Sequence, residues 1–285
     1  MATFLNVGII IASILLTLAV GLEVDSAAIR QAIRYRVRIL LLWVMQVVVP
    51  PVIALLIVRA LHLPLHVQAG LLLLAACPVG DIANVYTLLA RGPVAFSLAV
   101  NALSCLTAPL TMALTFAVYE GLLGADYAFA IPKPALVIRV FFLAVLPVCT
   151  GAAWRALHPA SVRRVRPWIR IICTGCIAVI IAYVLTTQWE QVIAETGSSF
   201  AAAIAFLCLT LAAGWWAGHG MKMPEKACTA FLIGVRNLGM MAAVAIVMLG
   251  RTDYAVFGAV YFLTQVVLAF TLVRWTLRRT GSAAA

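Results

Sequence analysis

The sequence contains few charged residues and very few acidic ones. Asp, Glu, Lys and Arg make up 10% of its 285 residues, and only nine residues are acidic. Hydrophobic residues make up 65% of the chain, and the mean hydropathy is +1.12. A soluble domain has about a quarter of its residues charged, so this composition excludes one. It indicates an all-α polytopic membrane protein.

The sequence patterns of common enzyme sites are also missing. The chain has no glycine-rich phosphate loop, Walker pattern, zinc-ligand spacing or nucleophile elbow. Cys173-x-x-Cys176 has the spacing of a redox motif, but it falls within an apolar run. We therefore expect neither an enzyme nor a bound cofactor. We also expect all seven cysteines to be buried, unreactive thiols.

Apolar runs of about 20 residues, each long enough to cross a bilayer as a helix, recur from end to end. They predict nine transmembrane helices in a single domain covering residues 1–285. The expected helices lie at about 4–22, 36–60, 65–90, 93–118, 134–154, 168–187, 198–219, 225–249 and 254–277. The first run lacks the basic region and cleavage site of a signal peptide, so we interpret it as a retained span.

The basic residues predict how these helices cross the membrane. If the loop between the first two helices is cytoplasmic, 15 of the 20 Lys and Arg lie inside and four lie outside. The remaining one, Arg236, lies within the eighth helix. This asymmetry predicts an external N-terminus and a cytoplasmic C-terminus. The net charge of +11 then belongs to cytoplasmic loops, and we expect no nucleic-acid partner.

Two polar stretches interrupt the apolar runs, one in each half of the chain. Residues 77–87 contain a Pro, a Gly, Asp81 and an Asn, and residues 232–239 contain Arg236, an Asn and two Gly. Pro lacks a backbone donor and Gly lowers helix propensity, so we expect a helix break near residues 78–84. Paired interruptions of this kind point to a binding site between the repeats of a transporter.

Asp81 and Arg236 are the strongest functional candidates. A charged side chain at the membrane centre costs about 3 kcal/mol on insertion scales and is usually paired and functional. The two interruptions lie five predicted helices apart, and an odd repeat length inverts the second copy. We therefore infer an inverted repeat whose first helix is missing. A crossing of the third and eighth helices would place Asp81 opposite Arg236.

Small polar side chains in the predicted helices are further candidates for substrate or ion binding. They are Gln46, Asn84, Thr87, Ser97, Asn101, Ser104 and Asn237. Ser97, Asn101 and Ser104 share one helix face because their spacing is i, i+4, i+7. Such residues equally often only bridge neighbouring helices. Trp215, Trp216 and His219 are more typical of anchors at the membrane interface.

The order and spacing of these motifs resemble the bile acid:sodium symporter family. The resemblance is carried by Cys77-Pro78-x-Gly80-x-x-x-Asn84-x-x-Thr87, by Leu103-Ser104-x-Leu106-x-Ala108-Pro109-Leu110, by Gly234-x-x-Asn237 and by Gln46 ahead of Pro50. It implies an inverted-repeat transporter in which the broken third and eighth helices cross. It also implies a core subdomain at about 36–118 and 198–278 and a panel subdomain at about 4–22 and 134–187.

The resemblance further implies two sodium sites, and this sequence departs from both. Asn84, Ser97 and Asn101 would belong to the first site and Gln46 to the second. Leu232 stands where the family has a Glu that serves both sites, and Arg236 stands where it has a Gln. The family also has Ser at the position of Ala83 and Thr at the position of Asp81. We hypothesise that Arg236 is a tethered replacement for sodium, and that Asp81 is its partner or a proton acceptor.

We therefore expect a secondary active transporter of a small organic anion in the bacterial inner membrane. With degenerate sodium sites, its transport would be proton-coupled or uncoupled, and sodium coupling is the less favoured alternative. Arg236 could hold a substrate carboxylate bidentately. The Ala, Arg and Val usage of the chain is typical of bacteria, which makes a small carboxylate a better substrate candidate than a bile acid. The alternative is a non-transporting membrane sensor or assembly protein that retains the fold.

Overall fold

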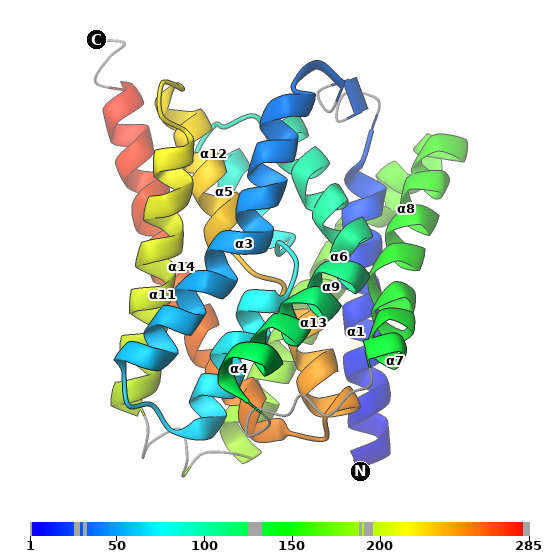
Figure 1. Ribbon diagram of the computed structural model, residues 1–285. Coiled ribbons are helices and arrows are strands. Elements are labelled where there is room, and N and C mark those ends of the chain that lie inside the picture. Colours follow the sequence, from blue (N-terminus) through cyan, green and yellow to red (C-terminus); the bar gives the residue numbers. More distant parts are fainter. Residues whose placement is uncertain are drawn as a thin grey trace.

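The computed structural model describes residues 2–25, 29–30, 33–124, 133–187, 190 and 196–281, without some of the side chains at 2–6, at 281 and between 170 and 196. The secondary structure of this described part consists of helices, the short segments that connect them and one isolated β-bridge. The helices form an elongated bundle, with the start of the first helix and the end of the last at opposite ends (Figure 1).

The elements follow one another in chain order along this bundle. They are α1 (Ala2–Glu23), α3 (Arg36–Ala60), α4 (Leu65–Ala76), α5 (Ile82–Leu89), α6 (Val94–Leu123), α7 (Lys133–Val140), the π-helical turn η2 (Phe141–Val145), α8 (Leu146–Leu157), α9 (Pro159–Thr187), α11 (Thr196–Ala217), α12 (Met223–Gly234), α13 (Leu238–Ala242), the π-helical turn η3 (Ala243–Met248) and α14 (Thr252–Gly281).

Five helical segments are long and apolar enough to cross a bilayer. They are Arg36–Ala60, Val94–Leu123, Lys133–Leu157, Gly197–Ala217 and Thr252–Thr280. Shorter apolar helices cover Val7–Glu23, Leu65–Ala76 and Leu238–Met248. On α3, Val44, Val48, Val52 and Leu56 form an exposed apolar stripe at four-residue spacing. Such a stripe fits a lipid-facing helix surface, so the membrane class expected from composition is confirmed.

The helix predicted at 65–90 is broken, and the break is shorter than expected. α4 ends at Ala76 and α5 begins at Ile82, whereas the sequence predicted a break over 78–84. The amides of Ala83 and Asn84 donate to the carbonyls of Gly80 and Asp81 at 3.1 and 3.0 Å, so the first turn forms immediately after the glycine. Asn84 therefore lies inside α5 and not in the break.

The sixth predicted helix begins earlier than expected. α9 begins at Pro159, whereas the prediction began at about residue 168. Pro is well tolerated in the first turn of a helix because its missing N–H would have no helical partner there. The Arg-rich segment that follows Pro159 therefore extends the helix N-terminally beyond the apolar run.

The cysteines are only partly as expected. Cys77, Cys105 and Cys228 are free and buried, as predicted, but Cys149 and Cys208 are exposed, so burial was wrong for these two. Both lie on apolar helices whose outer faces are not covered by other helices. The side chains of Cys173 and Cys176 lie outside the described residues.

The two broken helices cross each other at their breaks. Val79 and Arg236 form an antiparallel bridge. The amide of Gly80 donates to the carbonyl of Val235 at 3.1 Å, and the amide of Asn237 donates to that of Pro78 at 3.0 Å. A Cβ on Gly80 would lie 2.6 Å from the Arg236 carbonyl oxygen, so the crossing requires glycine there.

Close helix packing holds α1 against α8. A Cβ on Gly21 would lie 2.2 Å from the Val148 carbonyl, and one on Gly151 would lie 2.5 Å from the Leu18 carbonyl. Small residues let membrane helices approach in this way. Figure 1 shows α1, α7 and α8 together on one side of the bundle and α11 and α14 on the other, with the crossing between them.

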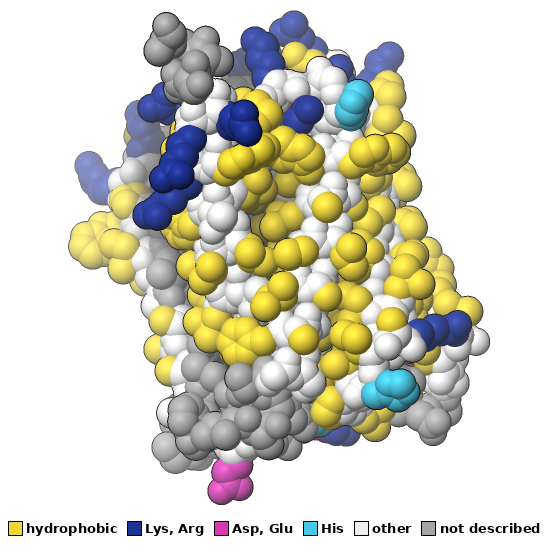
Figure 2. Space-filling model, turned by 90° about the vertical axis from the view of Figure 1, so that its left-hand side faces the viewer, with side chains coloured by type: hydrophobic (Ala, Val, Ile, Leu, Met, Phe, Trp, Pro, Cys, Tyr) yellow, Lys and Arg dark blue, Asp and Glu magenta, His cyan; other side chains and the backbone are white. Residues whose placement is uncertain are grey.

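The charges are distributed unevenly along the bundle. On the face seen in Figure 2, most Lys and Arg side chains gather at the end where α14 finishes, and hydrophobic side chains cover the middle. This agrees with the asymmetry that the sequence predicts for cytoplasmic loops.

Candidate functional site

Arg236 is the largest fully buried side chain of the described structure, with 1% of its surface exposed. Its Nη1 donates to the Gln46 side-chain oxygen at 3.1 Å and to the Cys77 carbonyl at 3.0 Å. Its Nη2 donates to the Gln46 carbonyl at 2.8 Å and to the Ile233 carbonyl at 3.3 Å. The guanidinium is therefore surrounded by oxygen atoms from α3 and from the ends of α4 and α12.

No carboxylate of the described residues lies within ion-pair distance of Arg236. The ion pair with Asp81 considered from the sequence is thus not formed in this structure. Guanidinium groups stay protonated in proteins, so the crossing carries a fixed positive charge. The Nε–H has no hydrogen-bond partner among the described residues. Neutral carbonyls, which also coordinate alkali ions at broken helices, compensate this charge.

A second polar cluster lies between α5 and α6. Ser97 Oγ donates to Asn84 Oδ1 at 2.7 Å, and Thr87 Oγ1 lies 3.4 Å from Ser97 Oγ. One turn along α6, Asn101 Oδ1 accepts from the Cys105 thiol at 3.5 Å. All four polar side chains named here are buried. The Nδ2 groups of Asn84 and Asn101 have no hydrogen-bond partner in the described part of the chain. The cluster therefore offers unpaired polar groups between two buried helix faces.

Hydroxyl groups support the crossing from both sides. Ser104 Oγ on α6 accepts from the Val79 amide at 3.0 Å. Tyr261 on α14 accepts from the Arg236 amide at 3.3 Å and donates to the Gly234 carbonyl. These bonds satisfy backbone groups that the helix breaks leave unpaired, as membrane burial requires.

Asp81 and Asn237 lie on the side of the crossing that faces α1 and α8. Asp81 is near the Cys105 thiol, and Cys105 packs with Val20 of α1 and Val148 of α8. Asn237 caps α13 by accepting from the Met240 amide at 2.9 Å. Gly239 in that helix packs against Leu16 and Ser13 of α1. Ser13 is buried, and its hydroxyl has no partner among the described residues.

Comparison with known proteins identifies the family. Residues 10–195 match the sodium bile acid symporter family, which is more than half of the chain. The chain belongs to the sodium bile acid symporter family. The matched residues include the first broken helix and end before α12, so the second broken helix is known from its geometry here.

Three curated relatives agree with this membership. The Bacillus subtilis (strain 168) protein named uncharacterized sodium-dependent transporter YocS is 24% identical over 227 residues, which are 79% of this chain and 69% of that protein. The probable sodium/metabolite cotransporter BASS1, chloroplastic, of Arabidopsis thaliana is 30% identical over 143 residues, 50% of this chain and 34% of the relative. Its namesake in Oryza sativa subsp. japonica is 27% identical over 210 residues, 70% of this chain and 49% of the relative. The chain thus spans half or less of the two plant proteins.

As a member of the sodium bile acid symporter family, the protein is a membrane transporter and not an enzyme. The family is one of sodium-coupled transporters. Within the described residues there is no group of three or more His, Cys, Asp or Glu that could hold a metal ion.

Two positions of this symporter family member differ from the residues that the resemblance implies at the sodium sites, Leu232 and Arg236. The Arg236 guanidinium already takes the oxygen atoms of Gln46, Cys77 and Ile233. Leu232, at the position where the resemblance implies a Glu, is fully buried and packs in an apolar cluster. The polar cluster between α5 and α6 therefore receives no carboxylate from position 232.

The structure arranges the predicted site residues around the crossing. Gln46 binds Arg236, and Asn84, Thr87, Ser97 and Asn101 form the polar cluster between α5 and α6. Asp81 and Asn101 both lie near the Cys105 thiol, Asn237 caps α13, and Ser104 supports the crossing itself. Sequence reasoning missed Ser13, Tyr261 and the backbone carbonyls. A lone hydroxyl in an apolar helix is too common to signal a site, and carbonyls leave no sequence signal.

Proposed function

We propose that this protein is a secondary active transporter of a small organic anion that works by alternating access. The observation that carries this proposal is the crossing of two broken helices around the buried Arg236. Broken helices that meet at mid-membrane are the usual substrate and ion sites of such transporters. A fixed cation there favours an anionic substrate.

An inverted repeat of the two halves is part of this proposal, and the spacing of the elements along the chain supports it. The bridged residues Val79 and Arg236 are 157 positions apart (236 minus 79). The same shift brings the starts of α1, α4, α5 and α6 to within one residue of the starts of α9, α12, α13 and α14. The hydroxyl groups that support the crossing show the same repeat. Ser104 follows its hydrogen-bond partner Val79 by 25 residues, and Tyr261 follows its partner Arg236 by 25 residues.

The repeat divides the nine proposed spans into two bodies that would move against each other. The core would comprise α3–α6 and α11–α14, and the panel α1 and α7–α9. The Gly21–Gly151 contact makes α1 and α8 a tight unit, which supports motion of the panel as one body. Asp81, Asn237 and Ser13 lie where the two bodies meet, so we assign the substrate to this interface.

Arg236 acts in this proposal as a tethered cation in place of the second sodium ion. A sodium ion 4 Å from the guanidinium would be repelled by about 4 kcal/mol at an effective dielectric constant of about 20. The carbonyls that would coordinate the ion are already hydrogen-bonded to the side chain. The protein then keeps the positive charge of the site without taking sodium from solution.

Asp81 is the candidate for proton coupling. It is the N-cap residue of α5 at the crossing, and no other Asp or Glu lies in either break. A carboxylate there can take a proton on one side of the membrane and release it on the other. In this account Asp81 carries a proton with the anion, while Arg236 stays charged throughout the cycle.

A transport-inactive sensor is the second candidate function, and Leu232 is the observation that favours it. Without the family carboxylate, the protein could bind a ligand and not couple it to an ion. Thermal stabilisation of the purified protein by a panel of small carboxylates, with and without sodium and across pH, would identify a ligand. Counterflow of that ligand in proteoliposomes supports the transporter, whereas binding without counterflow supports the sensor.

A further inference from the structure

Two adjoining cavities lie at the basic end of the bundle. The smaller, of about 170 Å³, lies between the starts of α3, α6 and α12 and is lined by Arg38, Phe96 and Glu225 among others. The larger, of about 540 Å³, lies between α3 and the end of α11 and is lined by Leu41, Met45 and Trp216 among others. Arg38 and Met221 line both cavities, so the two cavities adjoin at these side chains.

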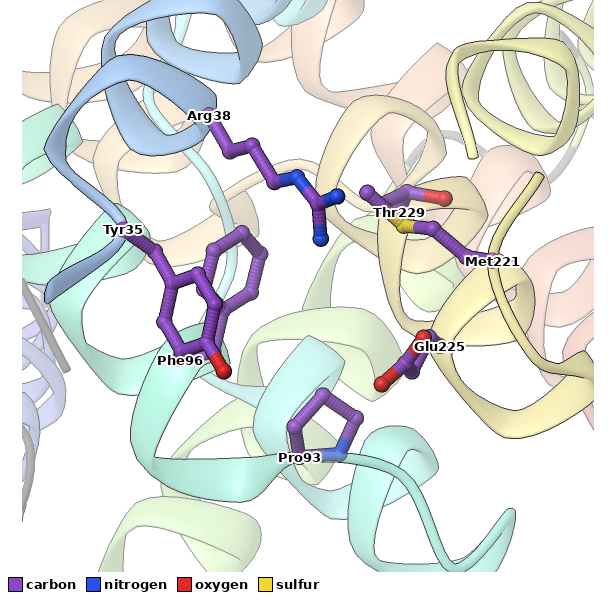
Figure 3. A pocket seen from close by; sticks show the side chains of 7 residues that line it. All are labelled: Tyr35, Arg38, Pro93, Phe96, Met221, Glu225 and Thr229. Carbon is purple, nitrogen blue, oxygen red and sulfur yellow. The ribbon is translucent and has the colours of Figure 1, made fainter. Parts of the chain in front are cut away.

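The smaller cavity has opposite charges on opposite walls. In Figure 3, the Arg38 guanidinium and the Glu225 carboxylate both point into the space between Phe96 and Thr229. No ion pair joins Arg38 and Glu225 in the described structure. One Glu225 oxygen accepts from the Lys222 amide at 3.1 Å, and the other has no partner among the described residues. The cavity thus suits a ligand with both a negative and a positive group.

The larger cavity is apolar and opens to the surface that faces lipid. Leu41 is 59% exposed and Trp216 is 74% exposed. Both belong to helices that are apolar enough to span the bilayer. Arg38 lies one turn before Leu41, close to where the α3 span begins at Arg36. The junction of the two cavities therefore lies at the level where lipid headgroups meet hydrocarbon.

We propose that these cavities bind a phospholipid whose headgroup carries a primary amine, as in phosphatidylethanolamine. The phosphate binds Arg38, the ammonium group binds Glu225, and an acyl chain fills the apolar cavity along Leu41 and Met45. The smaller cavity is below the roughly 300–1,000 Å³ of drug-sized sites, so it suits a headgroup better than a whole metabolite. Arg38 alone would favour any anionic lipid, whereas Glu225 adds the preference for the amine.

Binding of short-chain phosphatidylethanolamine, phosphatidylglycerol and phosphatidylcholine to the purified full chain in detergent tests this proposal. We expect the amine-bearing lipid to bind about tenfold more tightly than the other two, because one charge-assisted hydrogen bond is worth about that factor. Arg38→Gln should weaken all three lipids, and Glu225→Gln should remove only the preference for the amine. Gln keeps the helix cap that Glu225 provides, so this variant should fold.

Arg36→Gln is the matched control, because Arg36 is exposed at the same end and lines neither cavity. It should bind the lipids as the wild type does. Equal binding of the three lipids, or unchanged binding by Arg38→Gln, would overturn the proposal. Binding of soluble phosphoethanolamine as tight as that of the whole lipid would also overturn it, because the acyl chain would then contribute nothing.

Discussion

At the scale of single residues, Arg236 is central to the proposed mechanism. A buried cation in a membrane protein is usually paired with a carboxylate, yet this one is bound by a Gln side chain and by three carbonyls. Those oxygens come from both broken helices and from α3. The side chain thus joins the elements that a bound cation would otherwise hold together.

Replacing Arg236 and Leu232 by the residues that the family has at these positions tests this role. In the double variant Arg236→Gln with Leu232→Glu, the guanidinium no longer binds the oxygen atoms of Gln46, Cys77 and Ile233, and position 232 carries a carboxylate. We expect sodium to stabilise this variant by about 1.4 kcal/mol at a concentration ten times its dissociation constant, whereas the wild type should not respond. Thermal melts in sodium and in choline chloride measure the difference.

Arg251→Gln is the control for that measurement, because it removes the same charge from an exposed ion pair with Asp253. It should remain insensitive to sodium. If the wild type gained as much stability from sodium as the double variant, Arg236 could not be occupying the ion site.

Asp81 is expected to control the pH dependence of transport. With an inward proton gradient, uptake by the wild type should rise, because protonation of this carboxyl is coupled to substrate entry. Asp81→Asn should make uptake independent of the proton gradient, since the amide does not titrate in this range. Proteoliposomes loaded at fixed internal pH and diluted into buffers of different pH provide the measurement. An Asn variant with the full response would remove Asp81 from the coupling mechanism.

At the scale of helices, Gly80 decides whether the two breaks can cross. Gly80→Ala places a Cβ 2.6 Å from a backbone oxygen that cannot move independently. We expect a loss of about 1–3 kcal/mol of stability, as for other overpacked sites, and a large loss of transport. Melting temperature and uptake report the two effects. Gly121→Ala on α6 is the control, because a Cβ there meets nothing within 4 Å, and equal effects of both variants would contradict this role.

Most helix positions could be predicted because each apolar run must be long enough to span a membrane. α3 was predicted at the bounds that it has, and the break after α4 followed from Pro78 and Gly80. The early start of α9 and the π-helical turns η2 and η3 could not be predicted, since they depend on packing between helices. Sequence also identified Arg236 and its partner Gln46, but not the backbone carbonyls that bind Arg236, because their positions follow from the crossing.

At the scale of the whole molecule, the charge asymmetry predicts the orientation in the membrane. Lys and Arg gather at the end of the bundle where α14 finishes, so that end should be cytoplasmic (Figure 2). A fluorescent protein fused to the C-terminus should therefore fluoresce in a bacterial host, and an alkaline phosphatase fusion there should be inactive. The reverse pattern would invert the proposed topology and assign the lipid site to the outer leaflet.

In the proposed mechanism, the repeat allows the protein to lose sodium and keep alternating access. The Arg236 side chain then supplies the positive charge near the carbonyl groups of both halves in place of an ion. The most direct test is substrate uptake in proteoliposomes when external sodium is replaced by choline at constant pH. We predict unchanged uptake. Loss of uptake in choline would contradict the account, because it would mean that a sodium ion and not Arg236 completes the site.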